Sequence, residues 1–480
     1  MSKQTTKLVK AITSRDEDFA QWYTDVCKKA ELMDYTAAKG FIIYRPYGYR
    51  LWENIQEYLN EKFRQTGHDN VYFPLVIPES LFQKEADHVE GFAPETAIVT
   101  IGGKEELSER LIIRPTSEVL FCDHFSHIIS SYRDLPKKYN QWCSVVRWEK
   151  TTRPFLRGSE FLWQEGHTIH QTETEARQET MDILDIYRNL GKELLAIPFL
   201  TGKKTEKEKF AGAVDTYAIE ALMHDNKALQ SGTTHYLGTG FAKAFGIQFL
   251  DQSNQLQYVH QTSWGVSTRL IGAIIMVHGD DSGLVLPPFV APIQVIIVPI
   301  QTDREGVIEA CDTLAQRLSD KHLRVKVDKS DKSPGWKFSE SEMQGIPIRI
   351  EVGPRDLEKG ECVVVKRVNH SKTVEKLTVV ADKMPSMLQE IHDEMYQKAL
   401  DNAQDNTHES QSYAEFKELI ANNAGYVKMM WCGNSACETK IKEETTATSR
   451  CIPFIQEHLG DYCPVCGEKA KYLVYFAKAY

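Results

Sequence analysis

The stretch that decides the fold is RWEKTTRPFLRGSEFLWQEGHT, residues 147–168. It overlaps two runs rich in β-branched and aromatic residues, QWCSVVRWEK (141–150) and EFLWQEGHTIH (160–170), which lie on either side of a charged loop. This pattern predicts two antiparallel strands in a hairpin. A second stretch, WGVSTRLIGA (264–273), places an arginine at the start of an apolar run and predicts the beginning of an apolar helix.

Two arginines stand at the ends of these elements. Arg147 lies at a strand end, before a loop that also holds Arg153 and Arg157. A guanidinium there can hold a phosphate or a carboxylate through two parallel hydrogen bonds, although Arg147 alone could equally form a surface ion pair with Glu149. Arg269 is flanked by apolar residues, and its burial without an anionic partner would be costly. Together the two arginines predict an anion-binding site.

The common nucleotide-binding signatures are missing from the sequence. It contains no GxxxxGK[ST] loop, and its closely spaced glycines, Gly102-Gly103 and the pair Gly238 and Gly240, have no dinucleotide fingerprint around them. If the chain binds ATP, we expect side chains to hold it.

Length and composition indicate a folded protein of several domains. The 480 residues exceed what one core usually organises, and 42% apolar with 26% charged residues is ordinary for globular proteins. No apolar run approaches the ~20 residues that span a bilayer, and the start has no apolar signal region. Ten cysteines are too sparse for a disulfide scaffold, which indicates a reducing compartment. We therefore expect a cytoplasmic protein with no membrane segment.

The charge is unevenly distributed along the chain. A net charge of -10 argues against non-specific binding along a nucleic-acid backbone, which needs basic surface. Residues 289–383 are close to neutral, whereas the rest of the chain holds the negative excess. A local RNA site is best accommodated in that near-neutral part.

Breaks in the pattern divide the chain into three expected domains. The first covers residues 1–288 and ends at the pair Pro287-Pro288, which interrupts any regular element. In residues 289–383 strands alternate with helices, as in a compact α/β domain. Residues 384–480 carry a charged helical stretch followed by a cysteine-bearing tail.

Several elements can be placed within these domains. An amphipathic helix is expected over 48–67, a strand over 70–78 and a long helix over 173–195. After Pro385 the chain is expected to be helical to about Asn422.

Four cysteines near the C-terminus have metal-ligand spacing. Cys432 and Cys437 form one pair, and Cys463 and Cys466 form a second. Four thiolates in two pairs suit a tetrahedral structural zinc with no open position. The alternative is four free thiols in a reduced protein. Cys451 lies between the pairs and is expected to take no part.

Taken together, the arginine before a charged loop and the GxSTRxxGA stretch resemble motifs 2 and 3 of class II aminoacyl-tRNA synthetases. The likeness is greatest to the prolyl-tRNA synthetases of the archaeal and eukaryotic-like type, which lack an editing insertion. It covers nearly the whole chain and includes four further stretches: RPYGYRLWENIQ (45–56), FPLVIPESLFQKEADHVEGFAPE (73–95), RPTSE (114–118) and RWEKTTRPFLRGSEFLWQEGHT (147–168). The resemblance implies an α+β protein with a class II antiparallel-sheet catalytic core, an α/β anticodon-binding domain and a small zinc-containing C-terminal domain.

The resemblance also implies the reaction. Proline and ATP would form prolyl-adenylate, and the prolyl group would then pass to tRNA(Pro), with magnesium accompanying ATP. In this family Arg147 contacts both the amino-acid carboxylate and the α-phosphate, and Arg269 lies on ATP, so these two are the implied catalytic residues. Phe161 would stack on adenine. The residues that the resemblance places against ATP are Arg147, Glu149, Arg157, Phe161, Gln230, Thr233, Ser267 and Arg269.

The resemblance likewise implies a proline pocket. The carboxylate of Glu118 suits the secondary ammonium of proline, which offers two N–H donors. Without the neighbouring motifs, Thr116, Ser117 and Glu118 could simply be the start of a helix. A single histidine such as His235 is more often structural. The side chains implied to shape the pocket around the ring are Trp163, His167 and Phe210. The residues implied to bind proline are Thr116, Ser117, Glu118, Arg147 and His235.

Anticodon recognition is implied for the second domain. Glu342, Arg349 and Arg355, in SEMQGIPIRIEVGPRD (341–356), fall where the family reads the bases. Carboxylate and guanidinium groups supply the acceptors and donors for base edges. Lys366 and Arg367 are weaker candidates for phosphate contacts. Each of these residues could instead belong to a solvated charged face.

Three further expectations follow from the family. It forms homodimers, and the segment around Pro74 resembles motif 1 at the dimer interface. The interval between motifs 2 and 3 leaves no room for an editing insertion, so rejection of alanine would rest on the synthetic pocket or on a separate hydrolase. The terminal Tyr480 is expected to reach back toward the catalytic domain.

Two other functions remain open from the sequence alone. One is a threonyl- or glycyl-type synthetase of the same class. The other is a non-catalytic RNA-binding relative, and against it stands the retention of Arg147, Arg157 and Arg269.

Overall fold

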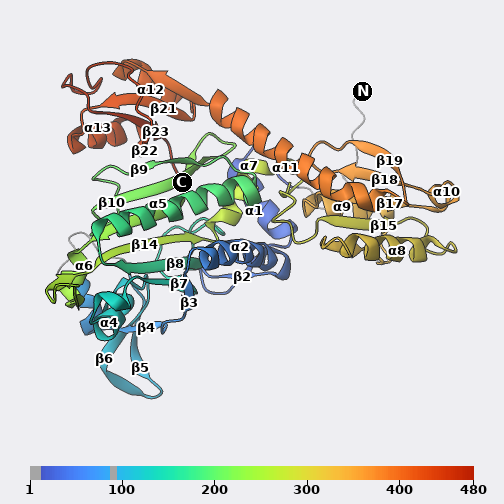
Figure 1. Ribbon diagram of the computed structural model, residues 1–480. Helices are drawn as coiled ribbons and strands as arrows, with labels where there is room; N and C mark the ends of the chain where they lie inside the picture. The colour runs from blue at the N-terminus through green and yellow to red at the C-terminus, as the bar shows by residue number, and fades with distance from the viewer. Residues whose placement is uncertain (1–11, 87–94) are drawn as a thin grey trace.

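The computed structural model describes residues 12–86 and 95–480 and has three parts (Figure 1). A large sheet with covering helices forms the centre, a smaller α/β unit follows residue 290, and the C-terminal residues form a third unit. The helix α11 (Val380–Asp405) runs between the second and third units. The eight-residue gap falls in the 73–95 stretch of the resemblance, so residues 87–94 of that stretch lie outside the described residues.

The central sheet is antiparallel over most of its width and carries the confirmed hairpin. Within the described residues its order is β20-β21-β23-β22-β9-β10-β11-β14-β8-β7-β3. The strands β7 and β8 pair antiparallel, with Val145 opposite Phe161. Gly166 permits the close approach of β14, since a Cβ there would lie 2.2 Å from the ring of Trp264. The strands of the first unit in this sheet are β3 (Asp69–Val71), β7 (Lys137–Val146), β8 (Glu160–His170), β9 (Leu200–Lys203), β10 (Asp215–Leu222), β11 (Ala228–Gly238) and β14 (His260–Ser267).

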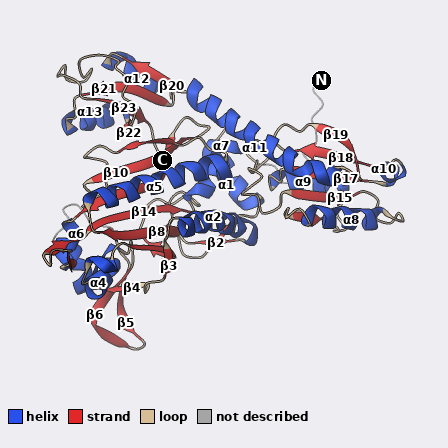
Figure 2. Cartoon of the chain, viewed as in Figure 1, coloured by secondary structure: helices blue, strands red, loops and turns tan. Residues whose placement is uncertain are grey.

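Helices lie against this sheet (Figure 2), and their buried side chains form one core with it. Trp22, Trp52 and Trp264 are at most 2% exposed and belong to one continuous core. The long helix was expected to reach residue 195 but ends at Leu190, and a wider π-helical turn follows over Gly191–Leu195. The chain then reverses at Ala196, whose φ is +51°. The helices of this unit are α1 (Phe19–Lys29), α2 (Pro46–Gln65), α3 (Glu79–Ala86), α4 (Glu118–Ile128), α5 (Glu173–Leu190), α6 (Gly240–Phe245) and α7 (Arg269–His278).

The single strand expected over 70–78 is two strands. β3 joins the central sheet, whereas β4 (Val76–Pro78) joins a separate three-stranded sheet in the order β4-β6-β5. Pro74 lies between them, and a proline has no N–H to donate to a ladder. The remaining strands of the first unit are β1 (Met33–Tyr35), β2 (Ile42–Tyr44), β5 (Ile98–Gly102), β6 (Glu105–Ile113), β12 (Gln248–Leu250) and β13 (Leu256–Tyr258).

The second unit is the α/β fold that its alternating pattern predicts. Its sheet has the order β16-β15-β17-β18-β19, parallel across the first three strands and antiparallel beyond them. Its own core includes Val295, Ile297 and Ile350. The elements are β15 (Val295–Pro299), α8 (Val307–Ser319), β16 (Val325–Val327), α9 (Pro334–Met343), β17 (Ile348–Val352), α10 (Pro354–Glu358), β18 (Glu361–Lys366) and β19 (Lys372–Lys376).

The helical stretch expected from Pro385 to about Asn422 begins earlier and is interrupted, although its second helix, α12 (Tyr413–Ala421), does end close to Asn422. The helix α11 begins at Val380 and contains Pro385 in its second turn, where the loss of one backbone hydrogen bond is offset by the burial of Val380, Ala381, Met384 and Leu388 on either side. The helix stops at Asp405, and β20 (Thr407–Ser410) follows as a parallel partner of β21. The third unit contains α12 (Tyr413–Ala421), β21 (Tyr426–Trp431), α13 (Ser435–Thr445), β22 (Thr448–Pro453) and β23 (Tyr472–Ala477).

The third unit is joined to the central sheet by strand pairing. Ile452 and Pro453 of β22 pair with Lys203 and Gly202 of β9. A Cβ at Gly202 would lie 2.5 Å from the Ile452 carbonyl oxygen, so the glycine permits this contact. The C-terminal unit therefore extends the central sheet through β22 and β9.

Within residues 12–86 and 95–480, none of the helices combines the length and the hydrophobicity that spanning a bilayer requires.

Candidate active site

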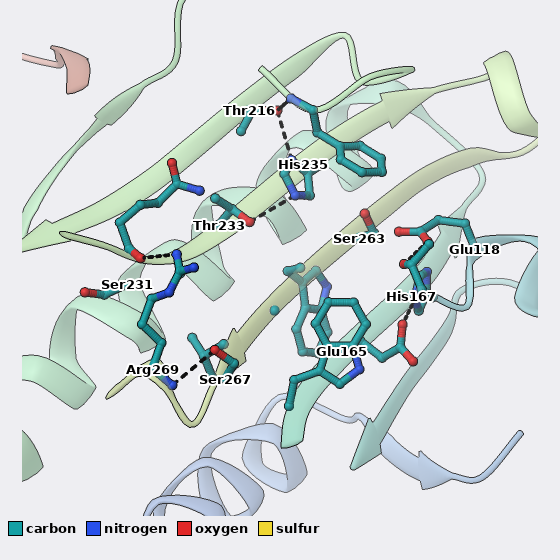
Figure 3. Close-up of a pocket in the computed structure, with 18 of the residues that line it drawn as sticks. Glu118, Glu165, His167, Thr216, Ser231, Thr233, His235, Ser263, Ser267 and Arg269 are labelled. Atoms are coloured by element: carbon teal, nitrogen blue, oxygen red, sulfur yellow. Dashed lines mark hydrogen bonds and ion pairs between the residues drawn. The ribbon is translucent and has the colours of Figure 1, made fainter. Parts of the chain in front are cut away.

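The strands β8, β10, β11 and β14, with Arg147 after β7 and the starts of α4 and α7, surround a cavity of about 290 Å³ (Figure 3). Alternation along each strand brings side chains from distant parts of the sequence to one face. The cavity is polar at both ends and aromatic between them. The residues expected at the site that line it are Thr116, Glu118, Arg147, Phe161, Trp163, His167, Phe210, Gln230, Thr233, His235, Ser267 and Arg269.

Glu165 is a cavity residue that the sequence analysis missed. Its side chain accepts hydrogen bonds from Ser117 Oγ (2.5 Å) and Gln141 Nε2 (2.8 Å), and its other oxygen lies 3.0 Å from His167 Nε2. Burial opposes ionisation of this carboxyl, but the partners, led by His167, outweigh that effect and lower its pKa. Strand alternation could have found it, because Glu165 lies between Trp163 and His167 on the same face.

The start of α4 presents a second carboxylate to the cavity. Glu118 is 5% exposed, and the Thr116 hydroxyl donates a hydrogen bond to it. Ser117 occupies the N-cap position but makes no side-chain cap hydrogen bond, because its hydroxyl is bound to Glu165. The segment is thus a helix start whose side chains serve the cavity instead of the helix.

Arg147 lies between the carboxylate end and the rest of the cavity. Its Nε donates to the Pro115 carbonyl (3.0 Å), and its guanidinium lies 5.5 Å from the ring centre of Phe161 and 5.4 Å from that of Trp163. Burial lowers the pKa of Arg147, and Glu118 partly opposes this. Over the described part of the chain no carboxylate forms an ion pair with it, so the alternative of a surface pair with Glu149 is not found.

Arg269 holds the opposite end of the cavity. It begins α7, its Nε donates to the Leu156 carbonyl (3.1 Å) and its Nη1 donates to the Gln230 carbonyl (3.1 Å). Burial lowers its pKa to about 10, and the neighbouring Arg157 and Arg147 contribute to the shift. At neutral pH the group remains a cation, held by neutral carbonyls and near other cations. Such an end is suited to a polyanion.

His235 lies on β11 beside an aromatic ring. Its Nδ1 is 2.9 Å from Thr216 Oγ1, its Nε2 is 3.0 Å from Thr233 Oγ1, and the Phe210 ring centre is 4.7 Å away (Figure 3). Burial lowers the pKa of His235 to about 3. The imidazole is therefore neutral at physiological pH and forms part of a small, uncharged niche.

Besides Glu165, the polar lining residues Thr216, Ser231 and Ser263 and two charged ones escaped the sequence analysis. Glu208 and Lys209 come from the loop between β9 and β10, immediately before Phe210. The composition of a loop does not indicate which distant strand the loop will contact. Of this loop, only Phe210 was predicted to lie at the site, and that prediction came from the family resemblance.

Glu149 and Arg157 do not line the cavity. They lie on the loop after β7, where Arg153 and Arg157 exchange backbone hydrogen bonds of 2.8 and 3.0 Å. Arg157 is exposed and Glu149 half-buried. Tyr480 approaches the same loop: its hydroxyl donates to Asp225 (2.6 Å), and its ring centre lies 5.8 Å from the Arg153 guanidinium. The expectation that the C-terminus reaches the catalytic unit is confirmed.

The candidate anticodon residues differ in exposure. Arg349 is buried, paired with Glu342 and Glu351 at 3.0 Å each, whereas Arg355 is exposed on α10. Arg367 is 2% exposed in its side chain and holds Asp280 through two hydrogen bonds of 2.7 and 2.6 Å. The guanidinium of Arg367 therefore joins the first and second units, which argues against the phosphate contact for which it was a weaker candidate.

Lys366 remains close to the surface. Its side chain, 21% exposed, pairs with the exposed Glu390 at 3.1 Å.

The four predicted cysteines come together. Their sulfur atoms lie within 4.8 Å of one another, and two of the separations, Cys432 to Cys437 and Cys466 to Cys432, are 3.7 Å. A tetrahedron with Zn–S bonds of about 2.3 Å has sulfur–sulfur edges of about 3.8 Å. The cluster therefore fits a four-coordinate metal. Cys451 lies apart from it, buried at the seam with β9.

Three segments of the chain match known protein families. Residues 99–278 match "tRNA synthetase class II core domain (G, H, P, S and T)" and residues 294–391 match "Anticodon binding domain". Residues 413–480 match "Prolyl-tRNA synthetase, C-terminal".

Similar whole proteins are also known. A "Proline--tRNA ligase" of Lachnoclostridium phytofermentans is 62% identical over 474 residues, covering 99% of each chain. One of Clostridium novyi is 60% identical over 480 residues, covering 100% of each chain. One of Lachnospira eligens is 59% identical over 474 residues, covering 99% of each chain.

Proposed function

The chain belongs to the prolyl-tRNA synthetase family and is a proline–tRNA ligase, and from that premise we propose that it works in two steps through an enzyme-bound prolyl-adenylate. The observation that carries the proposal is the two-ended cavity. The carboxylates of Glu118 and Glu165 lie at one end, Arg269 at the other, and Arg147 between them without a carboxylate partner in the described structure. This order of charges matches an amino acid joined to a nucleotide phosphate.

In this proposal the carboxylate end receives proline. The secondary ammonium donates to Glu118 and Thr116, with Ser117 and Glu165 holding that corner in place. The pyrrolidine ring occupies the uncharged niche of Trp163, Phe210 and His235. A neutral His235 suits an apolar ring, since a charged imidazole would have to be desolvated with it.

Arg147 then positions the reacting atoms. Its guanidinium holds the proline carboxylate and the α-phosphate of ATP together, so that the carboxylate oxygen attacks phosphorus and pyrophosphate leaves. Positioning and charge stabilisation are most of what such a transfer requires of a protein. No acid or base has to be assigned, because the attacking carboxylate is already ionised.

The other end of the cavity receives the rest of ATP. Adenine stacks on Phe161, and the phosphates lie toward Arg269, with Gln230, Thr233 and Ser267 beside them. The loop residues Glu149 and Arg157 close over the nucleotide. Magnesium would neutralise the outer phosphates, as it does in phosphoryl transfer generally.

The other units support transfer to tRNA. We propose that the second unit reads the anticodon through Glu342, Arg349 and Arg355, and that the cysteine cluster binds a structural zinc. Zinc fits because four thiolates at these separations leave no open position. We further propose a homodimer that pairs through the segment around Pro74, and a cytoplasmic location.

The adenylate step can be tested without tRNA. The protein, incubated with ATP, magnesium and labelled proline and then passed rapidly through a desalting column, should retain about one labelled prolyl-adenylate per active site. Hydroxylamine should release this label as the hydroxamate. Label that is retained only when tRNA is present would contradict the two-step scheme.

A further inference from the structure

The segment of residues 204–210 connects the C-terminal unit to the cavity. Its first half touches residues 438–450, and its second half, Glu208, Lys209 and Phe210, lines the cavity. The two halves belong to one short turn of chain, so whatever holds the first half also limits the movement of the second.

The first half is held by a buried carboxylate. Glu438, the residue after Cys437 on α13, is 4% exposed, and its Oε1 accepts a hydrogen bond from Thr205 Oγ1 at 2.7 Å. The Ser449 hydroxyl donates to the same oxygen. The Oε2 atom is buried and has no hydrogen-bond partner within the described structure. Burying a carboxylate with one oxygen unpaired is costly, so packing alone does not account for a glutamate here.

Neighbouring contacts fix the same stretch. Lys204, 2% exposed, donates from Nζ to the Arg450 carbonyl (2.8 Å) and to Glu220 (3.3 Å), and Arg450 itself holds Glu220 through both carboxylate oxygens. Lys207 Nζ reaches Thr439 Oγ1 at 2.7 Å. Lys204, Thr205 and Lys207 therefore all form hydrogen bonds with the C-terminal unit.

From Thr205 the contacts lead directly to the cavity wall. Its carbonyl accepts backbone hydrogen bonds from Glu208 (3.1 Å) and Lys209 (2.9 Å). The next amide, that of Phe210, donates to Thr216 Oγ1 (3.0 Å), and Thr216 in turn contacts His235 (Figure 3). A displacement of Thr205 therefore moves the wall beside His235.

We propose that Glu438 of the C-terminal unit is a positioning residue for the amino-acid end of the cavity. It holds Thr205, and Thr205 sets the placement of Glu208, Lys209 and Phe210. Glu438 touches no substrate itself, and the identification of that end with proline rests on the proposed function. The effect is confined to the amino-acid end, because the ATP end is formed by Arg269 and Gln230 on other elements.

The test compares four variants on the full-length protein. Glu438→Ala removes the acceptor, Thr205→Val removes the donor with little change of shape, and Glu438→Gln keeps an acceptor oxygen. Glu443→Ala is the matched control, since Glu443 is an exposed glutamate on the same helix. Each is measured by proline-dependent ATP–pyrophosphate exchange and by amide hydrogen exchange of residues 204–211 without substrates.

We expect Glu438→Ala and Thr205→Val each to raise KM for proline about tenfold, the loss of one hydrogen bond to a charged group. KM for ATP and kcat should stay within about twofold, and the amides of Glu208, Lys209 and Phe210 should exchange faster. Glu438→Gln should restore most of the affinity, Glu443→Ala should match the parent, and the double variant Glu438→Ala/Thr205→Val should be no worse than either single one.

Other results would overturn the proposal. An unchanged KM for proline, or equal rises in KM for proline and ATP, would show that Glu438 only stabilises its own unit. If Glu438→Ala fails to fold, Thr205→Val decides the question from the catalytic side. Hydrogen exchange needs no substrate, so unchanged protection would defeat this inference alone, whereas absence of proline-dependent exchange in the parent protein would defeat the proposed function.

Discussion

Arg147 shows at the scale of one residue how the site is prepared for an anion. Its guanidinium is fixed by the Pro115 carbonyl and lies near two aromatic rings, but it has no carboxylate pair in the described structure. A half-buried cation without a carboxylate partner is costly to desolvate, and the cost is recovered when an anionic ligand binds. The position of Arg147 at a strand end indicated an anion-binding role, but the sequence equally allowed a surface ion pair with Glu149. The structure shows no such pair among the described residues.

Substitution of the two arginines should abolish adenylate formation. Arg147→Ala and Arg269→Ala should each lower proline-dependent pyrophosphate exchange by at least about 10²–10³-fold, the usual cost of removing a group that stabilises developing charge. Arg147→Lys should recover little, because lysine cannot form two parallel hydrogen bonds. Arg64→Ala, on the exposed end of α2, is the control and should retain full activity. Retention of most activity in either cavity variant would mean that the site lies elsewhere.

Buried histidines should make the free energy of unfolding depend on pH between about 5 and 6.5, above the range in which carboxyl groups titrate. Burial lowers the pKa of His235 to about 3 and those of His170 and His278 to about 4, whereas an unfolded histidine titrates near 6.5. Below pH ~6.5 the unfolded chain therefore binds more protons, so stability falls as the pH drops toward 5, by up to about 1.4 kcal/mol per pH unit for each group.

Urea denaturation at pH 7, 6 and 5 measures this slope. His278→Gln, which can still donate to the Leu195 carbonyl, should flatten the slope, whereas His322→Gln at the exposed surface should not. Equal slopes in the two variants would show that His278 does not contribute.

At the scale of elements, the spacing of apolar residues predicted helices and strands correctly where one face of the element is buried. The hairpin of β7 and β8, the helix α2 and the α/β alternation of the second unit were all predictable, because strand and helix periods leave a clear apolar record. Pro74 was misjudged as an interior strand residue and Pro385 as a helix boundary. In both cases tertiary packing decided: β3 and β4 join different sheets, and the buried residues on either side of Pro385 keep α11 continuous through it.

The site was recoverable from sequence only in part, and for physical reasons. Residues in dense motifs, such as Thr116, Glu118 and Arg269, were found through the family resemblance. Glu165 could have been found from strand alternation. Glu208 and Lys209 could not, because their place depends on Thr205 meeting Glu438, more than two hundred positions away in sequence. Arg367 looked like a surface phosphate contact because the sequence does not reveal Asp280 opposite it.

The C-terminal element should influence activity through the loop after β7. Deleting Tyr480 removes the hydroxyl bound to Asp225 and the ring beside Arg153, so the loop that carries Glu149 and Arg157 loses a support. We expect pyrophosphate exchange to fall about tenfold, mainly in KM for ATP, the substrate that this loop is proposed to cover. Lys478→Ala, on the same tail, is the control. An unchanged rate after deletion would remove the role of the terminus.

At the scale of the whole molecule, the units form a connected structure rather than separate modules. The pairing of β22 with β9 extends the catalytic sheet into the C-terminal unit, and Arg367 with Asp280 joins the second unit to the first. Such connections would let the proposed zinc of the C-terminal unit affect the stability of the other units.

Metal analysis of the purified protein should find about one zinc per chain. Cys466→Ser should lose the metal and lower the thermal stability of the C-terminal unit, because a metal-bound structure gains its binding free energy as folding free energy. Cys451→Ser should keep the metal, since this thiol lies outside the cluster. Zinc-free parent protein of full stability would contradict the assignment.

The central claim, that this cavity activates proline with ATP, is tested most directly by ATP–pyrophosphate exchange with each of the amino acids in turn. Proline should drive rapid exchange without tRNA, and alanine should drive a much weaker exchange, because the ring niche of Trp163, Phe210 and His235 is only partly filled by a methyl group. Exchange driven by threonine or glycine while proline gives none would contradict the account.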